Sequence, residues 1–126
     1  MKTKTVGENK YLAASTQPGA ENASSQIKKV FFKSKNRCRV TFRVPKEVAA
    51  GAKKVCLVGD FNSWDAVAHP LKMFKNGSFS ITLDLEPGRE YQYRFLIDDT
   101  RWENDAFADK YNPSPYAGID NSVIIL

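Results

Sequence analysis

Several segments of the chain alternate between hydrophobic and polar residues with a period of two, which is typical of a β-strand with one buried and one solvated face. Residues 37–44, 78–85 and 90–98 show this alternation most clearly. The hydrophobic positions of the first segment are Cys38, Val40, Phe42 and Val44. Those of the third are Tyr91, Tyr93, Phe95 and Ile97, with Gln92, Arg94 and Leu96 on its other face. We predict a strand for each segment and a core position for each hydrophobic face.

Shorter apolar runs over 30–32, 53–58, 72–75 and 122–126 predict further strands. Asn76-Gly77 is typical of a two-residue hairpin turn. The sequence of residues 86–89 (EPGR) fits a type II turn, with Pro at its second position and Gly at its third. Strands at this spacing indicate an all-β fold, a β-sandwich of about seven to eight strands.

The remaining segments are predicted to be irregular. Residues 46–52 are the one helix candidate, and Gly51 limits it to a turn. Pro113 and Pro115 predict a loop before the last strand. Residues 1–26 are polar and poor in apolar side chains, so we expect a disordered tail there and a single domain over 27–126.

The net charge of +5 is unevenly distributed. Residues 27–54 contain ten basic residues and one acid, whereas residues 55–126 contain six basic residues and eleven acids. The basic block includes the polar strand face of Arg37, Arg39 and Arg43. Such a face either docks an acidic protein or nucleic acid, or is simply a solvated strand surface, which is the more common case.

Composition indicates a cytoplasmic protein without cofactors. No apolar run approaches the roughly 20 residues of a membrane span, and the N-terminus lacks a signal-peptide core. Cys38 and Cys56 fall in predicted strands, where a bridge is possible but two free, buried thiols are favoured in a reducing compartment. His69 is the only histidine, so no zinc spacing exists, and beside Pro70 it is interpreted as a surface loop residue.

The most informative motif is Gly59-Asp60-Phe61-Asn62-Ser63-Trp64, a turn that follows the apolar run 55–58. The turn ends on Trp64, one of two tryptophans in the chain. An indole presented by a turn either fills the rim of a core or forms a platform for a ligand. The polar residues before Trp64 favour the platform.

The chain also resembles a known family over about residues 36–126. The pieces that carry the resemblance are VCLVGDFNSW, SFSITLDLEPGREYQYRFLID, RWEND and DNSVIIL, in this order and preceded by the strand RCRVTFRV. They resemble carbohydrate-binding module family 48, the immunoglobulin-like early-set domain at the N-terminus of isoamylases and branching enzymes. The glycogen-binding domain of the AMP-activated protein kinase β-subunit is similar. The resemblance is greatest to small stand-alone bacterial early-set proteins without a catalytic domain.

The resemblance implies a non-catalytic module that binds α-1,4-glucans such as glycogen, starch or maltooligosaccharides. In this family two tryptophans stack on the sugars, and a basic residue and an asparagine bond the hydroxyl groups. The matching positions are Trp64, Trp102, Arg94 and Asn121. Their chemistry is suitable, because an indole packs on the apolar face of a pyranose, and guanidinium and amide groups bond its hydroxyls. A glycogen-metabolising enzyme is a possible partner.

Three departures from the family pattern bear on this site. Asp98-Asp99 replaces the Asp-Gly that is frequent before the second tryptophan, and the segment is one residue longer than in the kinase subunit. A shift of one residue along a strand moves a side chain to the opposite face, so the register of Trp102 decides whether it joins Trp64. Ile119 stands where the kinase subunit has Thr, which removes one polar group.

Plainer interpretations remain open for the other two residues. Arg94 could form a surface ion pair with Asp98 or Glu103, and Asn121 could shape the turn before the last strand.

Catalysis is the main competing class of function. Glycoside hydrolysis requires two positioned carboxylates, and no acid of this chain lies in a recognisable catalytic motif. A barrel domain of about 250 residues does not fit in this length, so a glycoside hydrolase family 13 label would come from two-domain relatives. The second competing class is a module that has lost sugar binding and uses the Arg37/Arg39/Arg43 face for a protein or, less favoured, for nucleic acid.

Overall fold

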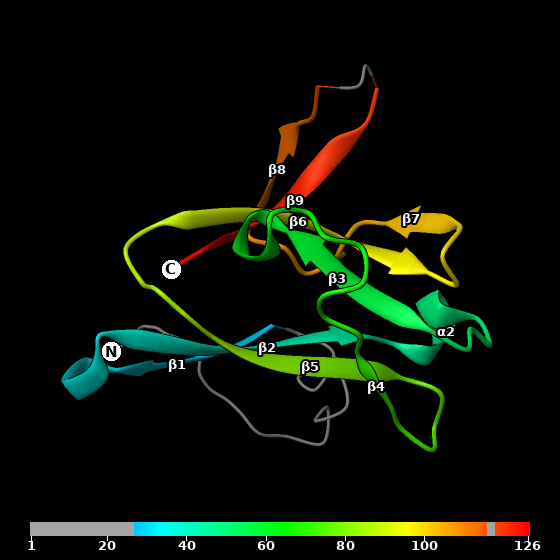
Figure 1. Cartoon of the computed structure of the whole chain (residues 1–126), viewed down its shortest axis with the longest axis horizontal. Helices are drawn as coiled ribbons and strands as arrows, with labels where there is room; N and C mark the ends of the chain where they lie inside the picture. The colour runs from blue at the N-terminus through cyan, green and yellow to red at the C-terminus, as the bar shows by residue number, and fades with distance from the viewer. Residues whose placement is uncertain (1–26, 116–117) are drawn as a thin grey trace, which may run out of the picture.

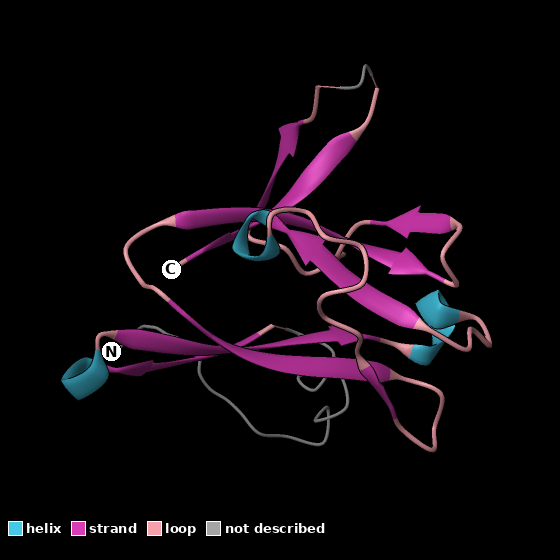
Figure 2. Ribbon diagram, in the orientation of Figure 1, coloured by secondary structure: helices cyan, strands magenta, loops and turns pink. Residues whose placement is uncertain are grey.

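A computed structural model describes residues 27–115 and 118–126, which form two antiparallel β-sheets facing each other (Figure 1 and Figure 2). The strands are β1 (Lys28–Phe32), β2 (Arg37–Val44), β3 (Val55–Gly59), β4 (Lys72–Met73), β5 (Phe79–Leu85), β6 (Glu90–Ile97), β7 (Arg101–Glu103), β8 (Lys110–Pro113) and β9 (Asp120–Ile125). Short helical turns are η1 (Lys33–Lys35), α2 (Lys46–Ala49) and η2 (Asp60–Asn62). The expected all-β sandwich is confirmed, while the tail predicted over 1–26 lies outside the described residues.

The two sheets differ in how their strands pair. The first sheet has the order β1-β2-β5-β4. The second has the order β3-β6-β9-β8, and β7 pairs with the end of β6 beyond β9. β6 is therefore the strand around which the second sheet is organised, because β3, β7 and β9 all pair with it.

The hydrophobic faces predicted for β2 and β6 meet between the sheets. Phe42 of β2 and Tyr93 of β6 are fully buried, with ring centroids 5.1 Å apart in an edge-on arrangement. Phe95 packs edge-on against Tyr93 at 6.0 Å. Such pairs are favoured by the quadrupole of the ring as well as by burial. The opposite faces of both strands are directed outward, and they carry the polar residues considered below.

The turn at residues 86–89 crosses from one sheet to the other and does not form a hairpin (Figure 1). Gly88 has a φ of +84°, as the third position of a type II turn requires. Its N–H donates to the carbonyl of Leu126 at 3.1 Å, and the hydroxyl of Tyr91 donates to the carbonyl of Glu86 at 2.8 Å. These bonds tie the crossover to the C-terminal strand and to the start of β6.

Some local predictions are corrected by the structure. The hairpin between β4 and β5 was predicted to have a two-residue loop, but its loop has three residues, 75–77. The N–H of Phe74 donates to the carbonyl of Ser78 at 2.8 Å and closes this loop. The segment before the last strand, predicted as a loop, contains β8. Pro113 is tolerated there because β8 lies at the edge of its sheet. β7 was not predicted either, since three residues are too short to show a period.

The two cysteines lie in different sheets, Cys38 in β2 and Cys56 in β3. Both are buried free thiols, and burial raises their pKa values. Buried thiols with raised pKa values are poor nucleophiles and act as small core residues.

One carboxylic acid is buried at the edge of the core. The hydroxyl of Tyr93 donates to Asp105 Oδ2 at 2.8 Å, and the N–H of Phe107 donates to Oδ1 at 2.9 Å. The N–H of Asp105 donates to the hydroxyl oxygen of Ser122 at 2.8 Å. Burial raises the pKa of Asp105 despite these donors, and burial also raises the pKa of Tyr93. The network joins the loop after β7 to strands β6 and β9.

Replacing Gly59 by Ala tests the close approach of this residue to strand β6. An added Cβ would lie 2.5 Å from the carbonyl oxygen of Gln92 and 2.7 Å from Cβ of Tyr93. We expect Gly59→Ala to lower the free energy of unfolding by about 3 kcal/mol, measured by urea denaturation. Gly51→Ala is the matched control: an added Cβ there meets nothing within 4 Å, and its left-handed φ of +78° costs only about 1 kcal/mol. Equal losses in the two variants would contradict the steric argument.

Asp105 predicts a pH dependence of stability. Because its pKa is raised in the folded state, ionisation is disfavoured there relative to the unfolded chain. The free energy of unfolding should therefore fall as pH rises from the ordinary range of an Asp pKa through the raised value, and level off above it. Asp105→Asn should remove this decline in urea unfolding at a series of acid-to-neutral pH values. The exposed Asp99→Asn should keep it, and a decline that persists in Asp105→Asn would show that another group causes it.

Candidate functional site

Asn62 holds the turn that follows β3. Its side-chain oxygen accepts from the N–H of Gly59 at 3.1 Å, and its side-chain nitrogen donates to the carbonyl of Leu57 at 2.9 Å. The same nitrogen lies 2.8 Å from Nδ1 of His69. His69, expected as a surface loop residue, is thus half-buried against the turn and is part of its support. A polar residue inside the motif therefore has a structural role.

Phe61 anchors the turn to the core. Its ring lies 5.7 Å from the ring of Phe42 and 5.8 Å from that of Tyr91, measured between centroids. The chain then leaves the core through Ser63 and Trp64, both left-handed with φ values of 56° and 58°. This conformation costs L-residues about 1–2 kcal/mol each, and such strain is often found at functional sites. The consequence is that Phe61 is directed inward and Trp64 outward.

A carboxylate holds the Trp64 indole in place. Indole Nε1 donates to Asp60 Oδ1 at 2.9 Å, and Asp60 Oδ2 accepts from the backbone N–H of Gln92 at 2.8 Å. Asp60 therefore connects the indole to strand β6. Trp64 remains 36% exposed, so part of the residue is accessible to a ligand.

The second tryptophan, Trp102, lies on the same side of the sheet as Arg94. Trp102 of β7 is paired with Leu96 of β6, and residues directly opposite each other in a sheet share a face. Leu96 and Arg94 are two positions apart on β6, so they share it too. In the turn before β7, Asp98 and Asp99 both adopt left-handed conformations. Trp102 is 46% exposed, and the Arg94 guanidinium lies 5.4 Å from its ring centroid.

A chain of hydrogen bonds runs between the tryptophans. Arg94 Nε donates to Asn121 Oδ1 at 2.8 Å, and Asn121 Nδ2 donates to Gln92 Oε1 at 3.0 Å. Asn121 is buried, and both of these side-chain bonds are made to residues of strand β6. Glu103 pairs with Arg101 at 2.6 Å and not with Arg94. Asp98 Oδ1 accepts from the backbone N–H groups of Lys53 and Lys54.

These residues surround one groove of about 680 Å³ on the outer face of the second sheet. Its lining residues are Asp60, Trp64, Gln92, Arg94, Trp102, Ser114, Pro115, Ile119 and Asn121. The β8–β9 hairpin, which projects from the body of the sandwich in Figure 1, provides four of them: Ser114, Pro115, Ile119 and Asn121. The groove combines two indole faces with a row of polar side chains whose positions are fixed by mutual hydrogen bonds.

The structure brings together all four residues singled out from the sequence, since Trp64, Trp102, Arg94 and Asn121 line the same groove. Two further polar residues were missed. Asp60 was interpreted only as a turn residue, and Gln92 only as a position on the polar face of β6. The alternation of β6 was the available signal for Gln92, because it lies two residues before Arg94 on that face.

The described part of the chain offers little for other chemistry. It holds no group of three or more His, Cys, Asp or Glu side chains that could bind a metal ion. No helix within the described residues is long and apolar enough to cross a membrane. Arg37, Arg39 and Arg43 alternate along the outward face of β2, in the opposite sheet from the groove.

A β-sandwich with an indole-lined groove on one face is the architecture of a carbohydrate-binding module. The family model of carbohydrate-binding module 48 (isoamylase N-terminal domain) matches residues 33–117, and the chain belongs to this family. The family assignment confirms the resemblance noted in the sequence and gives the chain the general role of a carbohydrate-binding module.

The chain is also similar to short segments of branching enzymes. The 1,4-alpha-glucan branching enzyme GlgB of Oceanobacillus iheyensis is 34% identical over 71 residues, covering 53% of this chain and 11% of the enzyme. GlgB 1 of Xanthomonas axonopodis pv. citri is 42% identical over 48 residues, covering 36% of this chain and 7% of the enzyme. The chain thus spans only a small part of these relatives.

A solved structure shares the fold at low sequence identity. Ferric enterobactin esterase from Salmonella typhimurium matches with a TM-score of 0.65 and 10% identity, covering 87% of this chain and 36% of the esterase. At this identity the match is evidence for the sandwich fold only.

Asp60→Ala tests how the Trp64 indole is positioned. The change removes the acceptor for Nε1 and the bond to the N–H of Gln92. We expect faster hydrogen exchange of the Trp64 indole N–H by NMR, and a loss of about 1 kcal/mol in unfolding free energy. Asp60→Asn keeps one acceptor oxygen and should fall between wild type and Asp60→Ala. The Trp102 indole is the internal control, and an unchanged Trp64 signal in Asp60→Ala would contradict this role.

Proposed function

We propose that residues 27–126 form a non-catalytic module that binds α-1,4-glucan chains in the groove on the second sheet. The observation that carries the proposal is the placement of two half-exposed indoles, Trp64 and Trp102, in one groove with Arg94 and Asn121. The family assignment supports carbohydrate as the class of ligand. The similarity to 1,4-alpha-glucan branching enzymes supports α-1,4-glucan within that class.

The chemistry of the groove suits a sugar chain. A pyranose ring has an apolar C–H face, which an exposed indole covers, and hydroxyl groups at its edges. Arg94 keeps guanidinium donors beyond the single Nε bond it makes to Asn121. Gln92 and Asn121 add amide groups beside it. The hydrogen bonds among these side chains hold them in place before the ligand arrives, which lowers the entropy cost of binding.

The groove fits binding better than hydrolysis. Glycosidases place two carboxyl groups about 5–10 Å apart across the scissile bond. Asp60 is the one carboxylate among the described lining residues, and both of its oxygens accept hydrogen bonds from the protein. The module would then act by holding glucan for a catalytic partner, and a glycogen-metabolising enzyme is the class of partner that this role requires.

Removing each indole tests the proposal. We expect wild-type protein to respond to maltoheptaose or β-cyclodextrin in a tryptophan fluorescence titration, with modest affinity. Trp64→Ala and Trp102→Ala should each weaken binding by about tenfold or more, because a stacked aromatic contributes on the order of 1.4 kcal/mol or more. Phe107→Ala, which removes an exposed aromatic that does not line the groove, should leave the affinity unchanged. Glucan binding would be refuted by two results together. The wild-type fluorescence would not change at millimolar sugar, and wild type and Trp64→Ala would bind glycogen equally.

Salt dependence separates this function from docking through the basic face. Stacking on a neutral sugar should hardly change with ionic strength, whereas contacts between opposite charges weaken as salt screens them. Maltoheptaose titrations at low and high NaCl should therefore give the same dissociation constant. A steep loss of affinity with salt would show that the ligand is held by charge and not by the groove described above.

A further inference from the structure

A second groove, of about 650 Å³, lies on the opposite sheet, at the hairpin between β4 and β5. Its lining residues are Arg43, Lys72, Met73, Phe74, Lys75, Asn76 and Ser78. Arg43 of β2 is paired with Ser80 of β5, and Ser80 is paired with Lys72 of β4. The two cationic side chains therefore share the outer face of the first sheet, and the glucan groove lies on the outer face of the second.

This second groove has an unbalanced positive charge. Its lining contains three cations and no acidic residue. Lys46 is also close, because a Cβ built on Gly77 would lie 3.4 Å from Lys46 Cβ. Among the described residues, the side chains of Arg43 and Lys75 make no hydrogen bond or ion pair, and the Lys72 ammonium lies 5.7 Å from the centroid of the Phe74 ring. Cationic side chains that line a groove without acidic partners raise the local concentration of anions.

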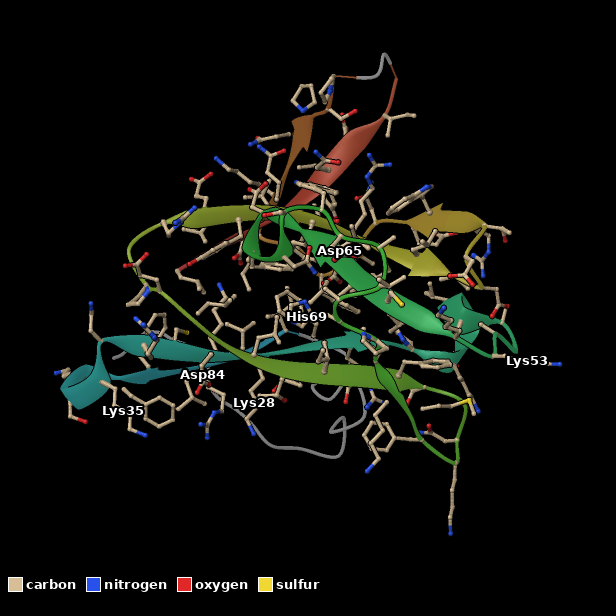
Figure 3. All side chains as sticks on the ribbon, viewed as in Figure 1. Lys28, Lys35, Lys53, Asp65, His69 and Asp84 are labelled. Atoms are coloured by element: carbon tan, nitrogen blue, oxygen red, sulfur yellow. The ribbon has the colours of Figure 1, made fainter. Side chains whose placement is uncertain are left out.

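The rest of the basic face is different. Asp84 lies opposite Arg39 and accepts from its Nε at 2.8 Å and from its Nη2 at 3.2 Å. This bidentate pair neutralises the charge of Arg39, and the Arg39 guanidinium lowers the pKa of the Asp84 carboxyl. Asp84 and Lys35 are labelled in Figure 3 toward the η1 end of the first sheet, away from the β4–β5 hairpin. Arg39 is thus compensated by an acid, whereas the three cations that line the groove are in no ion pair.

The Arg43 side chain has an unsatisfied hydrogen-bond donor. Its Nε is buried and has no hydrogen-bond partner. Buried donors are almost always paired, and an unpaired one is destabilising. An oxyanion is the kind of acceptor that a guanidinium binds most strongly, through two of its nitrogens at once.

We propose that this groove binds the phosphoryl group of a small phosphate monoester, such as a sugar phosphate. A phosphate monoester carries close to two negative charges at neutral pH and offers three acceptor oxygens, which suits Arg43, Lys72 and Lys75. Phe74 and Met73 are 39% and 54% exposed, and they provide an apolar wall for the rest of the ligand. The site is independent of glucan binding, since it shares no residue with the other groove.

The size of the charged area favours a small ligand over a macromolecule. A stable protein interface buries about 800 Å² on each partner, and nucleic acid needs a run of phosphate contacts. The Arg39–Asp84 pair interrupts such a run along β2. A volume of about 650 Å³ is within the range of small-molecule sites.

The test is an NMR titration of the full chain with glucose 6-phosphate, with inorganic phosphate as a second arm. We expect saturable shifts of the Arg43 Nε–H signal and of the backbone amides of residues 72–78. Inorganic phosphate should shift the same signals more weakly, because it lacks the part of the ligand that contacts Phe74. Maltoheptaose should leave these signals unchanged, so failure here is distinct from failure of glucan binding.

Two variants and one control separate a built site from general attraction. Arg43→Gln should weaken glucose 6-phosphate binding by about tenfold, since it removes a charge-assisted contact. The double variant Lys72→Gln/Lys75→Gln, confined to exposed side chains, should do the same if Arg43→Gln disturbs folding. Lys35→Gln removes one charge from the far end of the same sheet and should have little effect.

Three results would overturn the proposal. The first is an absence of saturable shifts with either phosphate compound. The second is an equal loss of affinity in Lys35→Gln and Arg43→Gln, which would indicate attraction by net charge alone. The third is binding of a DNA oligonucleotide or an acidic peptide that shifts signals along the whole of β2, without any response to glucose 6-phosphate.

Discussion

The close approach of Gly59 to strand β6 is the constraint on which the candidate glucan site depends. With no side chain at this position, the end of β3 lies directly against the backbone of Gln92 and Tyr93. Phe61 can then insert between the rings of Phe42 and Tyr91, and the chain must turn back outward at Trp64. A core contact thus decides where a surface aromatic is presented, which is how a rigid sandwich can hold a binding residue on a turn.

The two outer faces of the sandwich differ in how their polar groups are satisfied. On the second sheet, Asp60, Gln92, Arg94 and Asn121 are joined by hydrogen bonds to one another or to Trp64. On the first sheet, the cations around Arg43 have no such partners among the described residues. The first arrangement suits a neutral ligand that fits pre-positioned donors and acceptors, and the second suits an anion. The same fold therefore offers two chemically distinct surfaces.

Much of the fold follows from local pattern. The alternation in β2, β5 and β6 predicted their inward faces, because every second side chain of a strand falls on one side and the core selects the apolar set. The very short or edge strands β7 and β8 were not predicted. Their three and four residues carry no readable period, and they exist because β6 and β9 provide unpaired edges for them. The three-residue loop before β5 likewise depends on a pairing between Phe74 and Ser78.

The sequence by itself indicated the sandwich, through the periodicity of its strands, and the family, through motifs of adjacent residues. The resemblance to that family singled out four of the residues that line the groove on the second sheet. Only the tertiary structure decided which side chains become partners. Arg94 and Asn121 are 27 positions apart in the sequence, too far for a local motif to reveal their hydrogen bond. Asp60 likewise accepts from the backbone N–H of Gln92 in β6, which is 32 positions away. Asp84 forms an ion pair with Arg39, whereas the buried Nε of Arg43 has no hydrogen-bond acceptor. Hydrogen bonds and ion pairs depend on distances of about 3 Å, and only the folded chain brings residues from separate strands that close.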